Sequence, residues 1–103
     1  MQSEELLEVA QTSLEDLKAQ DVKVLDVRKL TSMADYLLIA SGTSDRHVRS
    51  LSDKLVESVR QAGARPLGIE GQDSGEWVLI DLNDVIVHVM QACTRDFYKL
   101  EDL

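Results

Sequence analysis

The sequence predicts a single α/β domain over residues 1–103, in which helices pack against a mixed β-sheet. Three observations predict this class: a length of 103 residues suits one domain, apolar residues recur at helical spacing in two separate segments, and five short runs have the composition of strands. The expected order of elements is α-β-β-α-β-β-β-α. An order of this kind forms a mixed sheet with helices on its surface.

The N-terminal part of the chain is expected to form one helix and two strands. Residues 4–19 place apolar side chains at helical spacing, and Ser3 in front of them is a candidate N-cap. Residues 22–27 are rich in β-branched side chains, which favours a strand. Residues 36–40 are continuously apolar, which is typical of a central strand covered on both faces.

A second helix is expected to begin after Ser44 and to end at Gly63. Serine is a good N-cap, and glycine often ends a helix because it adopts the left-handed conformation. The buried stripe of this helix is predicted to consist of Val48, Leu51, Leu55 and Val59. Pro66 then opens a brief strand over residues 67–70, at a position where the missing N–H is tolerated.

The last third of the chain predicts a β-hairpin followed by a helix. Residues 77–82 and 85–90 are strand-like runs that only Asn83 and Asp84 separate, and both residue types tolerate the positive φ of a tight turn. Thr94 is a candidate cap for the helix that follows. That helix would carry the apolar residues Phe97, Tyr98, Leu100 and Leu103.

The two-residue turn sets the register of the hairpin and divides its side chains between two unlike faces. Side chains alternate along a strand, so one face is expected to be a wholly aliphatic core face made of Val78, Ile80, Leu82, Val85, Val87 and Val89. The other face is mixed, because it pairs Trp77 with Met90, Leu79 with His88, and Asp81 with Ile86.

Two interpretations of the mixed face stay open. In the first, helices cover it as well, and His88 is a hydrogen-bonded core histidine. In the second, it is a partly exposed recognition face, because tryptophan and methionine are favoured at interfaces and an exposed apolar patch needs a functional reason. We favour an interface for Trp77, which begins its strand beside a polar loop.

The charge of the chain favours a cationic protein partner. The net charge is −8, and it is uneven: residues 1–66 carry 11 acidic and 9 basic side chains, whereas residues 67–103 carry 8 acidic side chains and only Arg95 and Lys99. Such a field repels phosphate backbones and anionic membranes, so direct nucleic-acid contact is not expected as the main interaction. Opposite charge on a protein partner would speed association.

The chain is expected to be cytoplasmic and to have no membrane anchor. Its first residues lack the basic region and apolar stretch of a signal peptide, and no apolar run approaches 18 residues. Cys93 is the only cysteine, so no disulfide can form within one chain.

The residue pattern gives little support for an enzymatic function. Gly42-Thr43-Ser44 precedes a helix and is similar to the glycine-serine loop of nucleotidyltransferases, but that chemistry needs paired carboxylates for divalent metal ions, and no Asp-x-Asp is present. His47 and His88 lie on different elements without metal-ligand spacing. We expect no catalytic residue, no cofactor and no metal.

Several short motifs follow one another in a specific order. They are Asp26-Val27, Asp35-Tyr36, Ser41–Val48, Glu70-Gly71, Trp77–Asp81, Val87-His88-Val89, Arg95, Phe97-Tyr98 and Leu100-Glu101. From about residue 4 to the C-terminus this ordered set resembles the ribosomal silencing factors, also called the Iojap-like proteins. One departure is the hairpin turn, which is usually Gly-Asp in the family and is Asn83-Asp84 here; asparagine can adopt the same left-handed geometry.

The resemblance implies both a fold and a function. The fold would be similar to that of nucleotidyltransferases without the catalytic carboxylates. The function would be repression of translation: the chain would bind large-subunit ribosomal protein number fourteen and obstruct joining of the small subunit when nutrients are short.

On this basis we predict a partner-binding site. Trp77 and Leu79 would be apolar anchors next to His88, with Tyr98 and Leu100 extending the patch, and with Asp81, Asp96 and Glu101 pairing with basic side chains. Two alternatives of other classes remain. One is a nucleotide-binding or nucleotidyltransferase-type enzyme that uses Gly42-Thr43-Ser44, and the other is a homodimer whose interface is the mixed hairpin face.

Overall fold

The computed structural model describes residues 2–98, which form three helices and one five-stranded mixed sheet. The elements are α1 (Ser3–Asp16), β1 (Gln20–Asp26), β2 (Tyr36–Gly42), α2 (Asp45–Gln61), β3 (Gly68–Glu70), β4 (Trp77–Asp81), β5 (Val85–Gln91) and α3 (Ala92–Tyr98). The predicted α/β class and the predicted order of elements are confirmed.

The strands lie in the order β1-β2-β5-β4-β3, so β5 is the central strand. Only β2 and β5 run parallel, and the other neighbouring pairs are antiparallel. The parallel pair requires a crossover, which α2 provides, and the remaining strands follow by hairpins. The sheet is therefore mixed, as expected.

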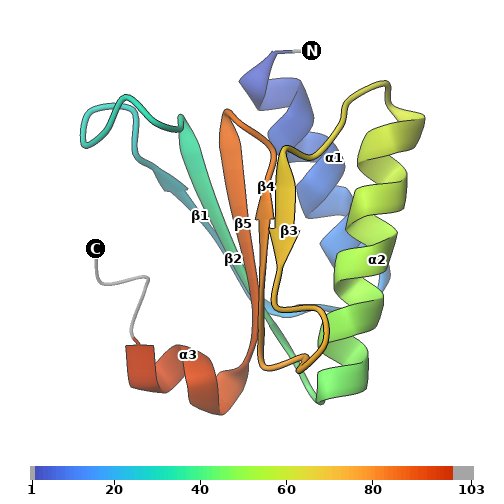
Figure 1. Cartoon of the computed structure of the whole chain (residues 1–103). Helices are drawn as coiled ribbons and strands as arrows, with labels where there is room; N and C mark the ends of the chain where they lie inside the picture. Colours follow the sequence, from blue (N-terminus) through green and yellow to red (C-terminus); the bar gives the residue numbers. More distant parts are fainter. Residues whose placement is uncertain (1, 99–103) are drawn as a thin grey trace.

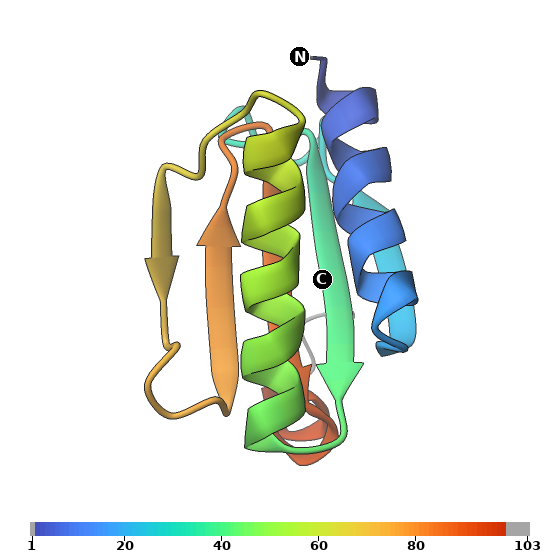
Figure 2. The same cartoon turned by 90° about the vertical axis from the view of Figure 1, so that its right-hand side faces the viewer.

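Helices α1 and α2 lie side by side on one face of the sheet, as Figure 2 shows. Their apolar stripes pack on the strand side chains that point toward them, and together these form the main core. All six aliphatic residues predicted for the core face of the hairpin lie in this core. The stripe predicted for α2 is also buried there: Val48, Leu51, Leu55 and Val59.

The ends of α2 follow the predicted signals. Ser44 is the N-cap, and its Oγ accepts a 3.0 Å hydrogen bond from the amide of His47. Gly63 has φ of +96°, and Ala64 donates back to the carbonyl of Val59 at 3.1 Å, as in a Schellman motif. The cap predicted for α1 was wrong: Gln2 is the N-cap and Ser3 is the first helical residue.

The hairpin register is the predicted one, with Leu79 opposite His88 and Trp77 opposite Met90. At the turn, Asn83 has φ of +76°, and Asp81 Oδ1 accepts a 2.9 Å hydrogen bond from the Asn83 amide.

The helix after β5 begins at Ala92 and not at Thr94, because the strand passes directly into it. In the described part of the chain, no helix combines the length and the apolar character that crossing a bilayer requires.

Candidate functional site

The face of the sheet opposite α1 and α2 is called the open face below. Of the three helices in residues 2–98, α3 alone lies on this side, at the end of the sheet where β5 finishes (Figure 1). Thus the two long helices do not cover the mixed hairpin face, as one interpretation of the sequence required. By the strand registers, the open face is formed by Lys23, Leu25, Leu37, Ile39, Ser41, Glu70, Trp77, Leu79, Asp81, Ile86, His88 and Met90.

The side chains of the open face form three rows across the strands. The row nearest α3 contains Ser41, Met90 and Trp77; the middle row contains Lys23, Ile39, His88, Leu79 and Glu70; and the row nearest the hairpin turn contains Leu25, Leu37, Ile86 and Asp81. Their centre is a second apolar cluster of Leu37, Ile39 and Met90, with Trp77 and Ile86 packed against it. The face is thus apolar in the middle, with a cation at its β1 edge and carboxylates at its β3 and β4 edge.

Trp77 and His88 form a hydrogen-bonded pair on this face. The indole Nε1 donates to His88 Nδ1 at 2.8 Å, and the two rings are tilted by 47° with their centroids 5.7 Å apart. An indole N–H is only a donor, so Nδ1 must be unprotonated and the proton of the neutral ring must be on Nε2. The pair therefore holds the indole in one orientation.

Burial keeps His88 neutral. Desolvation lowers its pKa from 6.5 to about 4, because the charged imidazolium would lose water contacts. His88 is therefore a hydrogen-bonded, half-buried histidine, and its role in recognition stays a prediction. The ring is satisfied at Nδ1, as a core histidine would be, yet it also lies in the middle row of an open face.

Helix α3 is tied to one end of the open face by Arg95. This side chain is only 2% exposed, and its guanidinium donates to the carbonyl oxygen of Asp21 at 2.6 Å and to Ser41 Oγ at 2.9 Å. Asp21 can offer its carbonyl because it has φ of +53° at a register shift between Gln20 and Lys23. The bulge in β1 and the arginine together determine where α3 leaves the sheet.

The structure brings four of the predicted site residues together. Trp77, Leu79, Asp81 and His88 lie on the open face, all half-buried. Asp96 is exposed on α3. The side chain of Tyr98, and Leu100 and Glu101, lie outside the described residues. The role of all eight as a partner-binding site stays a prediction.

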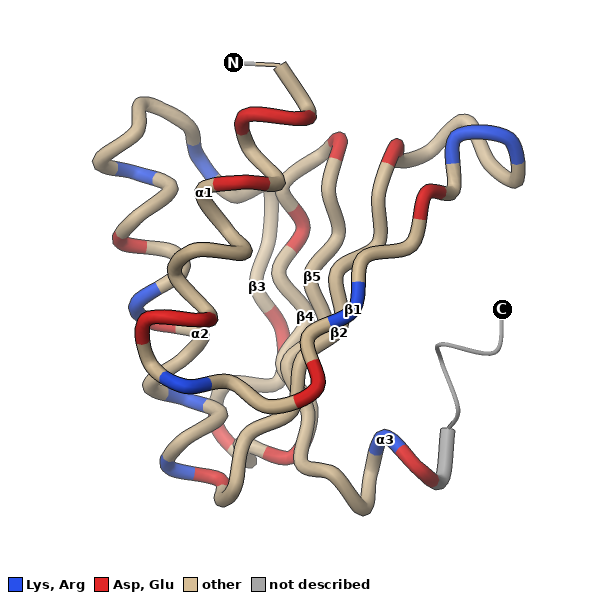
Figure 3. The backbone as a smooth tube through the Cα atoms, turned by 180° about the vertical axis from the view of Figure 1, so that it is seen from behind, with Lys and Arg blue, Asp and Glu red and all other residues tan. Residues whose placement is uncertain are grey.

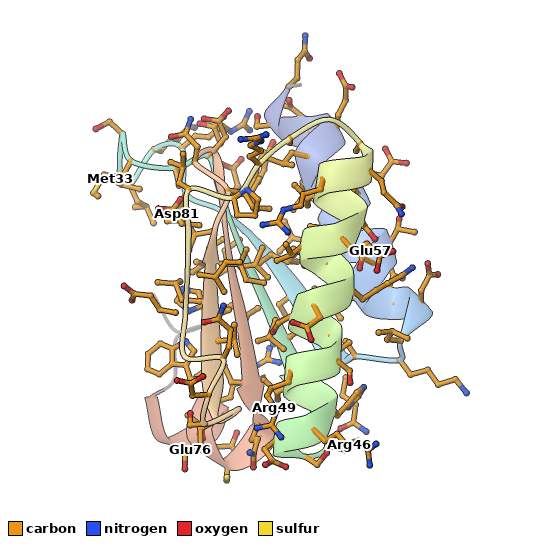
Figure 4. All side chains as sticks on the ribbon, turned by 45° about the vertical axis from the view of Figure 1, so that its right-hand side comes forward. Met33, Arg46, Arg49, Glu57, Glu76 and Asp81 are labelled. Carbon is orange, nitrogen blue, oxygen red and sulfur yellow. The ribbon has the colours of Figure 1, made fainter. Side chains whose placement is uncertain are left out.

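Asp81 also has a structural role in the hairpin turn. Its carboxylate accepts the amide of Asn83 and so supports the hairpin turn. Figure 4 shows Asp81 and Met33 at the same end of the molecule, away from Glu76. One carboxylate oxygen of Asp81 therefore serves the turn.

Sequence reasoning missed two depressions on this side of the molecule. One, of about 360 Å³, is lined by Glu70, Gly71, Trp77, Leu79 and His88. The other, of about 400 Å³, is apolar and is lined by Val27, Leu30, Thr31, Met33, Ala34, Leu37 and Ile86. Leu30 and Met33 are 72% and 81% exposed, which is unusual for large apolar side chains. Two large apolar residues, Leu30 and Met33, in an otherwise polar loop were the sequence signal that could have indicated the second depression.

In the Gly42-Thr43-Ser44 loop the central amide is already engaged by the protein. The amide of Thr43 donates to Nδ1 of His47 at 2.9 Å, and Nε2 of the same ring lies 2.8 Å from the carbonyl oxygen of Leu17. The next helical amides bond to Ser44 and Asp45. An anion site at a helix N-terminus needs such amides to be available. This geometry gives the nucleotide-binding alternative no support.

Charged side chains are distributed unevenly around the molecule. Figure 3 shows lysine and arginine along α2 and in the loop after β1, whereas β4 and β5 carry none. Among residues 2–98, no three His, Cys, Asp or Glu side chains lie close enough together to hold a metal ion.

Comparison with known proteins identifies close relatives. A family model described as ribosomal silencing factor during starvation matches residues 1–103. A protein named ribosomal silencing factor RsfS from Chromobacterium violaceum is 42% identical over 103 residues, which cover 100% of this chain and 84% of that protein. The protein of the same name from Bacillus subtilis is 35% identical over 103 residues, covering 100% of this chain and 87% of that protein.

A solved structure has the same fold. The crystal structure of a protein from Chromobacterium violaceum matches with a TM-score of 0.97 at 41% identity, covering 99% of this chain and 85% of that chain. The arrangement of three helices on a five-stranded mixed sheet is therefore shared with that relative.

Proposed function

We propose that this chain, which belongs to the family of ribosomal silencing factors, represses translation by binding the large ribosomal subunit. The partner on that subunit would be ribosomal protein number fourteen. The bound chain would block joining of the small subunit by occupying space that the small subunit needs, especially when nutrients are limiting. No chemical step is part of this mechanism, so the protein would act as a regulator and not as an enzyme.

The observation that carries the proposal is the open face of the sheet. On this face a buried apolar cluster of Leu37, Ile39 and Met90 is flanked by Trp77, Leu79 and Ile86, whose side chains stay partly exposed. A group of partly exposed large apolar side chains is typical of a protein interface. Trp77 and Leu79 are half-buried there, so each still offers apolar surface to a partner. Aromatic anchors at the centre of a patch supply most of the binding energy in typical interfaces.

Charge supports a basic protein as the partner. Glu70 and Asp81 lie at the β3 and β4 edge of the open face, and Asp96 is exposed on α3. These carboxylates would meet lysine or arginine side chains of a ribosomal protein and would repel RNA phosphates. Steering of this kind acts mainly on the association rate and weakens as salt screens it.

The same face would also suit a second copy of the chain. A homodimer through the open face would bury the residues that we assign to the ribosomal partner, so the two assemblies would compete. Sedimentation at several protein concentrations measures the self-association, and competition predicts that added large subunits dissociate the dimer. The proposed compartment is the cytoplasm, where such a factor would meet its ribosomes.

Co-sedimentation with ribosomal particles tests the proposed function. The chain should sediment with isolated large subunits and not with joined ribosomes, and it should lower the fraction of joined ribosomes when it is added before the small subunit. Binding to the small subunit alone, or equal binding to joined ribosomes, would contradict the steric mechanism. Cross-linking from an open-face position should recover ribosomal protein number fourteen.

A further inference from the structure

The depression next to Trp77 has an unusual set of walls. Its volume is about 360 Å³, and it is lined by Glu70, Gly71, Trp77, Leu79 and His88. Most of this lining is apolar, yet a carboxylate stands at its edge. Within residues 2–98, no hydrogen bond or ion pair involves the side chain of Glu70. An unpaired carboxylate beside an aromatic ring is a suitable environment for a cation.

The backbone of Gly71 builds this depression. Its φ is +88°, and a Cβ atom added there would lie 2.0 Å from the carbonyl oxygen of Trp77. Only glycine lets the chain turn so close to the start of β4. Glu70 is also paired with Leu79 in the sheet register, so its side chain is on the open face. The motif Glu70-Gly71 therefore places the carboxylate close to the Trp77 side chain.

The Trp77–His88 pair gives the depression a fixed wall. His88 Nδ1 accepts the indole N–H, which holds the orientation of the indole ring. The proton on Nε2 makes the remaining nitrogen of His88 a donor, so the imidazole presents no competing positive charge. The depression thus combines an oriented π-system, the aliphatic side chain of Leu79 and a single negative charge.

We propose that this depression receives an arginine side chain of the partner protein. The methylene groups of the arginine would lie against Leu79, its guanidinium plane would stack on the Trp77 indole, and Glu70 would accept its N–H groups. This inference rests on the proposed function, since it takes the partner to be a basic protein. It adds Glu70 as the residue that selects a cation at this position.

Arginine fits these walls better than lysine does. A guanidinium is planar and weakly hydrated, so it stacks on an aromatic ring and still donates two parallel hydrogen bonds to one carboxylate. An ammonium is compact and strongly hydrated, and it would lose more hydration on a largely apolar surface. The geometry of a flat ring beside a carboxylate therefore favours the arginine.

A ligand titration tests the depression without any ribosome. Trp77 is the only tryptophan, so its indole N–H gives a single resonance in an NMR spectrum. Titration with Nα-acetyl-arginine amide should shift this resonance saturably, and the Glu70→Gln variant should weaken that binding at least about fivefold. The uncharged isostere Nα-acetyl-citrulline amide should not saturate it. Equal shifts with both ligands, or an unchanged response in Glu70→Gln, would overturn the proposal.

Binding to isolated large subunits then separates the proposal from the function on which it rests. Glu70→Gln should weaken this binding at least about fivefold, because a charge-assisted hydrogen bond becomes a neutral one. Glu57→Gln is the matched control, since Glu57 is exposed on α2, away from the open face (Figure 4). If Glu70→Gln binds subunits like the unmodified chain, the arginine site is wrong and the function stands. If the unmodified chain does not bind subunits, the function fails, and the arginine titration alone decides the site.

Discussion

The indole nitrogen of Trp77 donates a 2.8 Å hydrogen bond to Nδ1 of His88, across neighbouring antiparallel strands. The two residues are not directly opposite each other: Trp77 faces Met90, and His88 faces Leu79. The bond is therefore diagonal, which long aromatic side chains can span. It joins the row nearest α3 to the middle row of the open face and makes the orientation of the tryptophan depend on an unprotonated histidine.

This relationship predicts a pH dependence of stability. Burial lowers the pKa of His88 from 6.5 to about 4, so between these values the unfolded chain binds a proton that the native chain does not. The contribution of His88 to the free energy of unfolding should therefore be fully present above pH 6.5. The free energy of unfolding should fall by about 1–3 kcal/mol as the pH drops toward 4. Urea unfolding at a series of pH values measures this loss.

The control for that experiment is His88→Asn. The asparagine Oδ1 can accept the indole N–H, but the side chain does not titrate. The variant should lack the part of the acid-dependent loss that belongs to His88, while other titrating groups affect both chains alike. Identical pH profiles for the two chains would show that His88 is not the titrating group.

The partner-binding role of Trp77 predicts a large effect of truncation. Trp77→Ala should weaken binding to isolated large subunits by at least about 2 kcal/mol, or roughly 30-fold, because a central aromatic anchor is lost. Val24→Ala is the control, since Val24 is exposed and its side chain is on the other face of the sheet. Circular dichroism should show that both variants are folded. A folded Trp77→Ala chain with undiminished affinity would remove Trp77 from the site.

The glycine at the depression predicts a sharp difference between two alanine substitutions. Gly71→Ala should lower the free energy of unfolding by more than about 2 kcal/mol, because its φ is positive and its Cβ would collide with the carbonyl oxygen of Trp77. Gly68→Ala, three residues earlier, has no atom within 4 Å of its Cβ and should change stability by less than about 0.5 kcal/mol. Chemical denaturation of both variants checks the difference, and equal costs would contradict it.

The buried arginine of α3 predicts another difference. Arg95→Leu should destabilise the fold by about 2–4 kcal/mol, since the carbonyl of Asp21 and the hydroxyl of Ser41 would lose their donor. Arg46→Leu, at an exposed position labelled in Figure 4, should change stability by less than about 0.5 kcal/mol. Thermal unfolding should separate the two by at least about 8 °C for a domain of this size. Similar melting temperatures would show that Arg95 does not hold α3.

Much of the fold could be predicted because its signals are local. Ser44 and Gly63 bound α2 through hydrogen bonds within a few residues of themselves, and the turn at Asn83 sets the hairpin register by counting alone. Strand alternation then assigns each hairpin side chain to a face without knowledge of the rest of the molecule. The predicted cap of α1 was wrong by a single position, Ser3 in place of Gln2, which is the usual uncertainty of a helix boundary.

The candidate site could be predicted only in part. Trp77, Leu79, Asp81 and His88 come from one hairpin, so the same counting places them together. Glu70 joins them through pairing with Leu79, and this pairing depends on the position of a three-residue strand at the sheet edge. A strand so short has no periodicity from which its facing can be determined.

By itself, the sequence determined the order of elements, the two unlike faces of the hairpin and the acidic balance of the last third of the chain, since each depends on composition, spacing or short-range geometry. Only the tertiary structure decided that α1 and α2 share one face and leave the other open (Figure 2). It also decided that Trp77 donates to His88, because counting along the hairpin places both side chains on one face but does not orient their rings. Only the structure could show that Arg95 reaches Asp21, because these residues are far apart in the chain.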